Sequence, residues 1–155
     1  MSQRPTLHVT IVTAQRTVFE GEAEMVNAPG SEGQLGILPR HAPLLTTLAV
    51  GELRVRQRGV DESFYVGGGF LEVNANVVTV LADDAERAAN IDEAHAQEAR
   101  RRAQALLEDR GTDVDQATLA AELERAVGRI RVAELHRRRG GRGRPVDQRG
   151  EDLGG

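Results

Sequence analysis

The chain has 155 residues, a net charge of −4 and an aromatic content of only 3%, and it contains no lysine or cysteine. The missing cysteine excludes disulfides, thiol nucleophiles and cysteine zinc sites, and the missing lysine excludes a Schiff base and a phosphate-loop lysine. No apolar run approaches the roughly 20 residues that span a bilayer, and the first residues lack a signal-peptide pattern, so we expect a soluble, unexported protein.

Residues 1–84 have the period-two pattern of half-buried strands. Leu7, Val9 and Ile11 alternate with polar residues, and similar alternation returns around residues 53–56 and 64–66. Turn-forming residues separate these segments; one run, Gly67-Gly68-Gly69, is expected to form a bulge or a tight sheet corner. We therefore predict an antiparallel β-sandwich domain over residues 1–84.

Residues 85–136 change to helix-forming Ala, Glu, Arg and Leu. The segment from Asn90 to Glu93 has capping-box spacing, and residues 113–116 can cap a second helix. Spacings of four and three in the second helix predict a seam for one partner helix, formed by Leu119, Leu123, Ala126, Ile130 and Ala133. We predict an antiparallel helical hairpin over residues 85–136. Its alanine-rich contacts bury little area, so it should undock at modest cost.

Residues 137–155 are rich in arginine and glycine and offer little for a core. We expect this tail to be disordered. It is the only basic part of the chain, with 6 arginines against 3 acidic residues. An alternative function is therefore a stand-alone β-sandwich binding module whose tail contacts nucleic acid.

No catalytic or metal-binding constellation stands out. The histidines lie in different segments without metal-ligand spacing, and no serine stands in Gly-x-Ser-x-Gly. His41 lies between two prolines, which favours a structural or contact role. Arg102, Arg125 and Arg129 either converge when the hairpin packs or form a solvated face paired with acidic neighbours. We predict a protein that is not an enzyme.

Three segments, residues 28–45 (APGSEGQLGILPRHAPLL), 65–73 (YVGGGFLEV) and 77–83 (VVTVLAD), closely resemble the epsilon subunit of bacterial F-type ATP synthase. The resemblance covers roughly residues 5–136, in the same order of sandwich and hairpin. It implies a non-catalytic subunit of the rotor's central stalk in a proton-translocating ATP synthase. Such a subunit is peripheral, on the cytoplasmic face of the cell membrane, and reaches the membrane only through its complex.

The resemblance also implies the partners. The sandwich is expected to bind the gamma subunit and the polar loops of the c-ring, and the contact residues expected here are Ser31, Glu32, Gln34 and His41. The hairpin is expected to extend along gamma into the alpha/beta catalytic head and to restrain ATP hydrolysis. No nucleic-acid partner is expected on this reading.

Some family members bind regulatory ATP in the folded hairpin through an Ile-Asp-x-x-Arg-Ala motif with flanking charged residues. The matching positions here, beside Ile91, are Glu86, Asp92, Ala96, Arg102, Arg125 and Arg129. His95 stands where the motif has arginine, and an imidazole lacks the planar five-donor fork of a guanidinium. We therefore expect no cofactor beyond weakly bound ATP.

Overall fold

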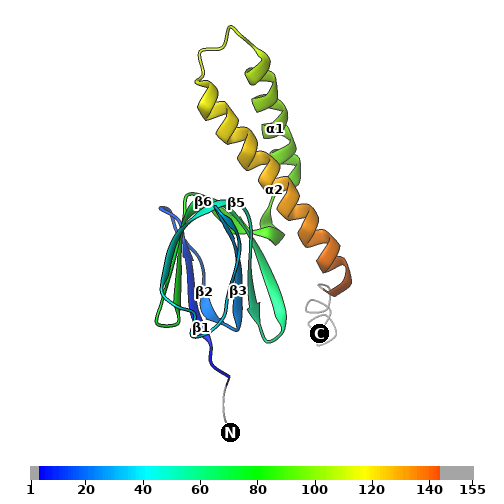
Figure 1. Ribbon diagram of the computed structural model, residues 1–155. Coiled ribbons are helices and arrows are strands. Elements are labelled where there is room, and N and C mark those ends of the chain that lie inside the picture. The colour runs from blue at the N-terminus through cyan, green and yellow to red at the C-terminus, as the bar shows by residue number, and fades with distance from the viewer. Residues whose placement is uncertain (1–3, 144–155) are drawn as a thin grey trace.

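The computed structural model describes residues 4–143, with the side chains of residues 4–140. Its parts are a two-layered β-structure and a helical hairpin that rises from one end of it (Figure 1). The strands are β1 (Leu7–Val12), β2 (Thr17–Ala23), β3 (Met25–Gly30), β4 (Gly33–Ile37), β5 (Leu44–Gln57), β6 (Val60–Asn74), β7 (Val77–Ala82) and β8 (Ala85–Arg87). A short 3-10 helix, η1 (Ala88–Asn90), leads to the helices α1 (Glu93–Glu108) and α2 (Gln116–Gly143).

The strands form one sheet that folds over on itself, in the order β2-β1-β7-β6-β5-β3-β4, with β8 paired to β6. Strands β5 and β6, of 14 and 15 residues, pair along their length and pass from one layer into the other. Gly68 and Gly69, at this bend, have φ angles of 101° and 125°, which side chains rarely allow. A Cβ at Gly69 would also collide with the Leu81 carbonyl oxygen. The expected sheet corner is confirmed.

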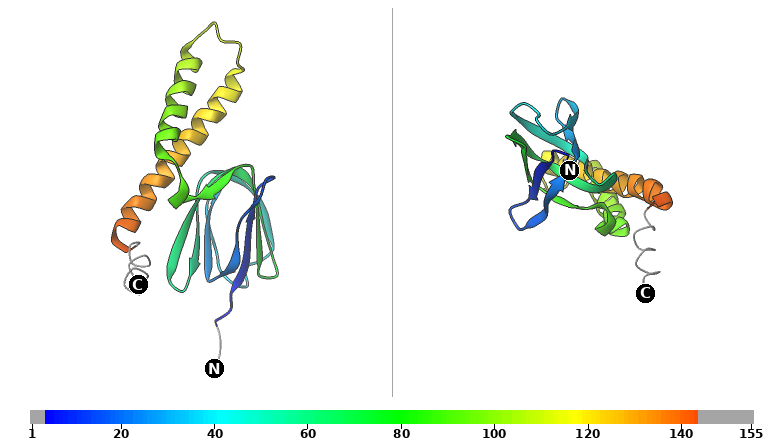
Figure 2. Two further views of the ribbon diagram at one scale, coloured as in Figure 1. Left: turned by 180° about the vertical axis from the view of Figure 1, so that it is seen from behind. Right: turned by 90° about the horizontal axis from the view of Figure 1, so that it is seen from below.

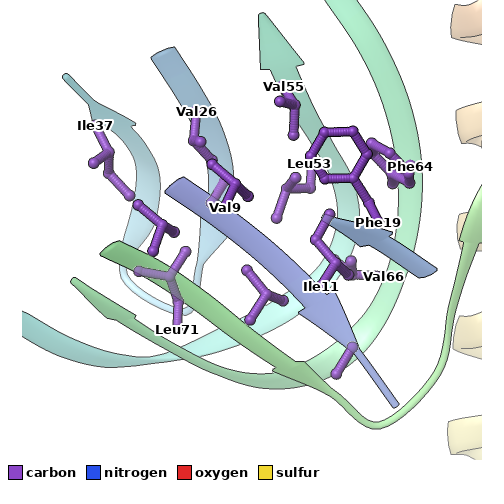
Figure 3. Packing of buried hydrophobic residues seen from close by; sticks show 14 of the residues in the cluster. Val9, Ile11, Phe19, Val26, Ile37, Leu53, Val55, Phe64, Val66 and Leu71 are labelled. Atoms are coloured by element: carbon purple, nitrogen blue, oxygen red, sulfur yellow. The ribbon is translucent and has the colours of Figure 1, made fainter. Parts of the chain in front are cut away.

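The space between the two layers is filled by alternating side chains of the strands (Figure 3). Val9, Leu53 and Val66 are fully buried, and Phe19 meets Phe64 edge to face with ring centroids 5.5 Å apart. All buried members of this core lie between Leu7 and Ala85, so within the described residues no helix contributes to it. The sandwich core is therefore complete without the hairpin.

One strand pair departs from the predicted antiparallel arrangement. β1 and β7 run parallel, with Val9 beside Val78 and Ile11 beside Val80. Alternation has the same period in parallel and antiparallel strands, so it identifies the buried face without giving the strand direction. The prediction of a sandwich is confirmed, with this pair as a correction.

The junction between the two parts lies later than residue 84. Ala85 pairs with Val66, so β8 still belongs to the sheet. The first helix is capped by Asp92 and not by Asn90: the Asp92 carboxylate accepts a hydrogen bond from the backbone N–H of His95 at 3.0 Å. Residues 88–90 form η1 instead, which follows directly from the strand and displaces the helix start.

The second helix is longer than predicted. It continues to Gly143, so the expected disordered tail is wrong for residues 137–143. Arg137 pairs with Glu93 of α1 and Arg139 with Glu52 of β5, and these contacts hold the last turns in place. The remainder of the predicted tail, residues 144–155, lies outside the described residues. Within the described residues, no helix has the length and apolarity needed to cross a membrane.

Two faces of α2 are used for packing. The predicted seam is buried in the hairpin at Leu119, Ala126 and Ile130. A second face, on nearly the opposite side of the helix from the seam, points toward the sandwich, where Gly128 and Val132 lie against Tyr65 and Val50. Figure 2 shows the C-terminal half of α2 passing beside the sandwich while the hairpin tip extends away from it. The sandwich therefore contacts only one part of the hairpin.

Candidate functional site

The predicted contact residues fall at opposite ends of the sandwich. Ser31 and Glu32 form the exposed turn between β3 and β4, and the Ser31 hydroxyl lies 2.6 Å from that of Thr47. Gln34 follows this turn and borders a groove beside α2. His41 lies beyond the far end of β4, where the neighbouring Arg40 N–H donates to Asn76 at 2.6 Å. The structure therefore groups Ser31, Glu32 and Gln34 and separates them from His41.

An exposed apolar row crosses the outer face of the layer that contains β1, β7 and the C-terminal part of β6. Phe70 of β6 pairs with Leu81 of β7, and Leu81 pairs with Val12 of β1. Phe70 is 51% exposed and Leu81 54%, and Leu45 on the same face is 71% exposed. Large apolar side chains gathered on one face are typical of a protein-binding surface. Sequence reasoning missed this row.

A charged cluster borders the same face. His8 of β1 lies between two carboxylates of β2, with Nδ1 2.8 Å from Glu22 and Nε2 3.0 Å from Glu20. Thr6 donates a further hydrogen bond to Glu22 at 2.7 Å. Both ring nitrogens face acceptors, so the doubly protonated imidazolium fits this site best. The hydrogen bonds that His8 donates to Glu22 and then to Glu20 raise the pKa of His8 above its ordinary value.

We predict that the contribution of this cluster to the stability of the fold depends on pH through the protonation of His8. Because the folded-state pKa of His8 is raised, its contribution to stability is full below about pH 6.5 and is lost as the pH rises through the folded pKa. An NMR titration of the His8 ring should give a pKa above 6.5, and Glu22→Gln should lower it. Glu24→Gln, outside the cluster, is the matched control. Equal His8 pKa values in the native chain and in Glu22→Gln would contradict the prediction.

Arg129 joins α2 to the sandwich. Its Nε donates to Glu86 at 2.9 Å, and a terminal nitrogen donates to Asp84. Its guanidinium carbon lies 4.6 Å from the centroid of the Tyr65 ring, within cation–π range. The side chain of Arg129 is only 27% exposed, so these charges are partly shielded from water. We call Tyr65, Asp84, Glu86 and Arg129 the hairpin latch.

Tyr65 makes the latch weaker than its charges suggest. The residue is fully buried, and burial raises its pKa to about 12, so the hydroxyl stays neutral. Within the described part of the chain this hydroxyl has no hydrogen-bond partner. An unsatisfied buried polar group costs about 1–3 kcal/mol, and undocking the helix would return it to water. The contact is therefore suited to release.

Gly128 sets how closely α2 approaches. A Cβ at this position would lie 2.6 Å from Cγ1 of Val50 and 3.3 Å from the Tyr65 ring. Glycine in a helix costs about 1 kcal/mol relative to alanine, so its presence here needs a packing reason. The absence of a side chain lets the helix backbone rest on the bend of the sandwich.

The residues predicted for nucleotide binding are only partly brought together. Glu86 and Arg129 meet as an ion pair within the latch. Asp92 caps α1, Ala96 is 2% exposed inside the hairpin, and Arg102 lies on the exposed surface of α1. Two carboxylates thus already occupy the Arg129 guanidinium that a phosphate would need.

Within residues 4–140, the remaining predicted positions make no hydrogen bond to the latch. Arg125, one turn before Arg129, is half-buried and acts electrostatically on the Tyr65 hydroxyl. His95 is exposed in the first turn of α1. No group of His, Asp and Glu side chains among residues 4–140 is arranged to hold a metal ion. The geometry is that of a helix-docking contact with a cationic side.

Comparisons with known proteins match both parts of the chain. The family model described as "ATP synthase, Delta/Epsilon chain, beta-sandwich domain" covers residues 6–88, and that described as "ATP synthase, Delta/Epsilon chain, long alpha-helix domain" covers residues 89–134. The chain is 50% identical to the ATP synthase epsilon chain of Alkalilimnicola ehrlichii over 135 residues, which are 86% of this chain and 96% of that protein. It is 50% identical to the ATP synthase epsilon chain of Halorhodospira halophila over 136 residues, with the same coverage.

The fold also resembles that of a solved chain. A chain in the OSCP/F1/c-ring structure of the mitochondrial ATP synthase of Euglena gracilis matches with a TM-score of 0.72 and 22% identity. The match covers 88% of this chain and 85% of that one.

Proposed function

Because the chain belongs to the ATP synthase delta/epsilon chain family, as a non-catalytic subunit of the central stalk, we propose that its sandwich links the gamma subunit to the c-ring and that its hairpin restrains ATP hydrolysis. The reading as a stand-alone nucleic-acid-binding module is set aside, because the family match runs through both the sandwich and the helices. The protein reaches the cytoplasmic face of the membrane through its complex.

One observation carries the proposal for the hairpin. The sandwich has a complete core of its own, whereas the hairpin rests on it through a separate small cluster of Tyr65, Ala88 and Val132 and through the latch. A unit attached in this way can leave without unfolding the rest. The released hairpin would then extend along gamma toward the alpha/beta head and oppose hydrolysis, while the docked hairpin would permit it.

The surfaces of the sandwich suit two partners. We assign the polar turn of Ser31, Glu32 and Gln34 to the polar loops of the c-ring. The apolar row through Phe70, together with His41, is assigned to gamma, because a buried apolar contact suits a permanent partner. The two surfaces lie on different layers of the sandwich, so both partners can bind at once.

Cysteine crosslinking tests these assignments, and it is clean because the chain has no native thiol. We predict that Gln34→Cys traps a cysteine in the c-subunit polar loop and that Phe70→Cys traps one in gamma. Arg56→Cys, exposed on β5, should trap neither and serves as the control. Efficient trapping of the c-subunit from another part of the sandwich, with none from Gln34→Cys, would relocate that interface.

For nucleotide we propose weak regulatory ATP binding at most. His95 replaces a guanidinium, and Asp84 and Glu86 compete for Arg129. Because a hydrogen bond to a charged group contributes about 1.5–3 kcal/mol, His95→Arg should tighten ATP binding roughly ten- to a hundredfold in calorimetric titration. Gln104→Arg, exposed farther along α1, is the control for added charge. Tight binding by the native chain, unchanged in His95→Arg, would show that this position does not limit the site.

A further inference from the structure

The last turns of α2 make a second contact with the sandwich, apart from the latch. Arg139 forms a bidentate ion pair with Glu52 of β5: its two terminal nitrogens donate to Oε2 at 2.5 Å and to Oε1 at 2.8 Å. The Ser63 hydroxyl donates to the same carboxylate at 2.5 Å. A planar guanidinium that meets both carboxylate oxygens is the strongest geometry for such a pair.

Glu52 lies in surroundings that keep its carboxylate charged and nearly buried. Its side chain is only 11% exposed, and Arg54 lies 3.9 Å away as a second cation. Burial opposes the charged form, but the hydrogen bonds from Arg139 and Ser63 outweigh it and lower the pKa of Glu52. The carboxylate is therefore charged at neutral pH, and it loses its best partner whenever α2 leaves.

The position of Arg139 makes this contact a second attachment point of α2, separate from the latch. The family model for the long helix ends at residue 134, so Arg139 lies in an extension beyond it. Arg129 and Arg139 are about 15 Å apart along a helix. Between them, Val132 and Leu135 lie on the face that borders β5. A helix fixed at two separated points cannot pivot about the latch alone.

We propose that Glu52, Ser63 and Arg139 form a clamp, here called the Glu52 clamp, that holds the hairpin on the sandwich and makes its release harder than the latch alone would. This inference rests on the proposed function for one consequence only: a hairpin held more firmly inhibits hydrolysis less. The docking role itself is a property of the isolated full chain.

Thiol labelling measures that role, since a cysteine placed at the docked contact reacts only when the helix undocks. Val132 is 1% exposed in the contact, so Val132→Cys is the probe in the full chain. Arg139→Ala should speed its labelling roughly three- to tenfold, as expected for a partly exposed charge pair. Arg138→Ala, an exposed neighbour, should leave the rate unchanged.

A second probe separates undocking from unfolding. Val9→Cys, fully buried in β1, should label at the same slow rate with and without Arg139→Ala. An unchanged rate at Val132→Cys, or equal acceleration at both probes, would overturn the clamp. Faster labelling at Val132→Cys with unchanged hydrolysis by the assembled complex would keep the clamp and overturn the inhibitory role of the hairpin. A rise in hydrolysis on deleting the hairpin, without faster labelling in Arg139→Ala, would keep the inhibitory role of the hairpin and overturn the clamp.

Discussion

Ending the chain after Asn90 is expected to raise ATP hydrolysis by the assembled complex roughly two- to tenfold, which is about 0.4–1.4 kcal/mol in the barrier. This cut retains β8 and η1 and every buried residue of the sandwich core. The sandwich should therefore fold and keep its partners, while the element proposed to oppose hydrolysis is gone. Steady-state hydrolysis by complexes with the native and the shortened chain measures the effect.

The control for this deletion is a chain that ends after Gly143, which keeps the latch and the Glu52 clamp. It should behave as the native chain does. Hydrolysis that stays the same after the Asn90 cut, across nucleotide concentrations and with or without a proton gradient, would contradict the proposed inhibition.

Gly128→Leu is expected to act in the opposite direction and lower hydrolysis. A leucine at this position would enter the space held by Val50 and the Tyr65 ring, and overpacking of this kind costs about 1–3 kcal/mol. Leucine is also a better helix former than glycine, so α2 itself should remain intact. The substitution should therefore push the hairpin off the sandwich and increase the inhibitory form.

Val127→Leu is the matched control, because Val127 is 43% exposed on the same helix. Thermal unfolding should show the same sandwich transition in both variants. If hydrolysis rises with Gly128→Leu, the docked hairpin is the inhibitory form and our assignment is reversed.

The strands could be predicted from the sequence because alternation at positions such as Leu7, Val9 and Ile11 depends only on which face is buried. The parallel pairing of β1 with β7 could not, because it joins segments far apart in the chain and leaves the alternation unchanged. The end of the sheet was placed too early for a similar reason. Residues 85–87 have helix-forming composition, and only pairing with β6 makes them a strand.

The helices were predicted as a hairpin because the seam through Leu119 and Ile130 has heptad spacing. The second face of α2 could not be predicted from apolar periodicity, because its central member, Gly128, has no side chain and adds nothing to the apolar pattern. Its signal was the glycine itself, which is costly in a helix of good helix formers. The far end of the helix depends on Arg139, whose partner Glu52 is distant in sequence.

The candidate sites were predictable only in part. Arg129 and Glu86 were paired as members of a nucleotide site, whereas their contact with Tyr65 and Asp84 depends on how α2 crosses the sandwich. The apolar row had a visible sign in the sequence. In pairs such as Phe70-Leu71 and Val80-Leu81 both neighbours are apolar, so in a strand with only one buried face one of them points outward.

The central claim is that the docked hairpin permits hydrolysis and the released hairpin opposes it. A disulfide between Val50→Cys and Gly128→Cys tests it most directly, because a Cβ at 128 would lie 2.6 Å from Cγ1 of Val50 and the chain has no other thiol. Hydrolysis by the complex that carries this pair should rise on oxidation to the level of the Asn90 deletion and fall again on reduction. Hydrolysis that stays at the native level, or drops, when the hairpin is locked onto the sandwich would contradict the account.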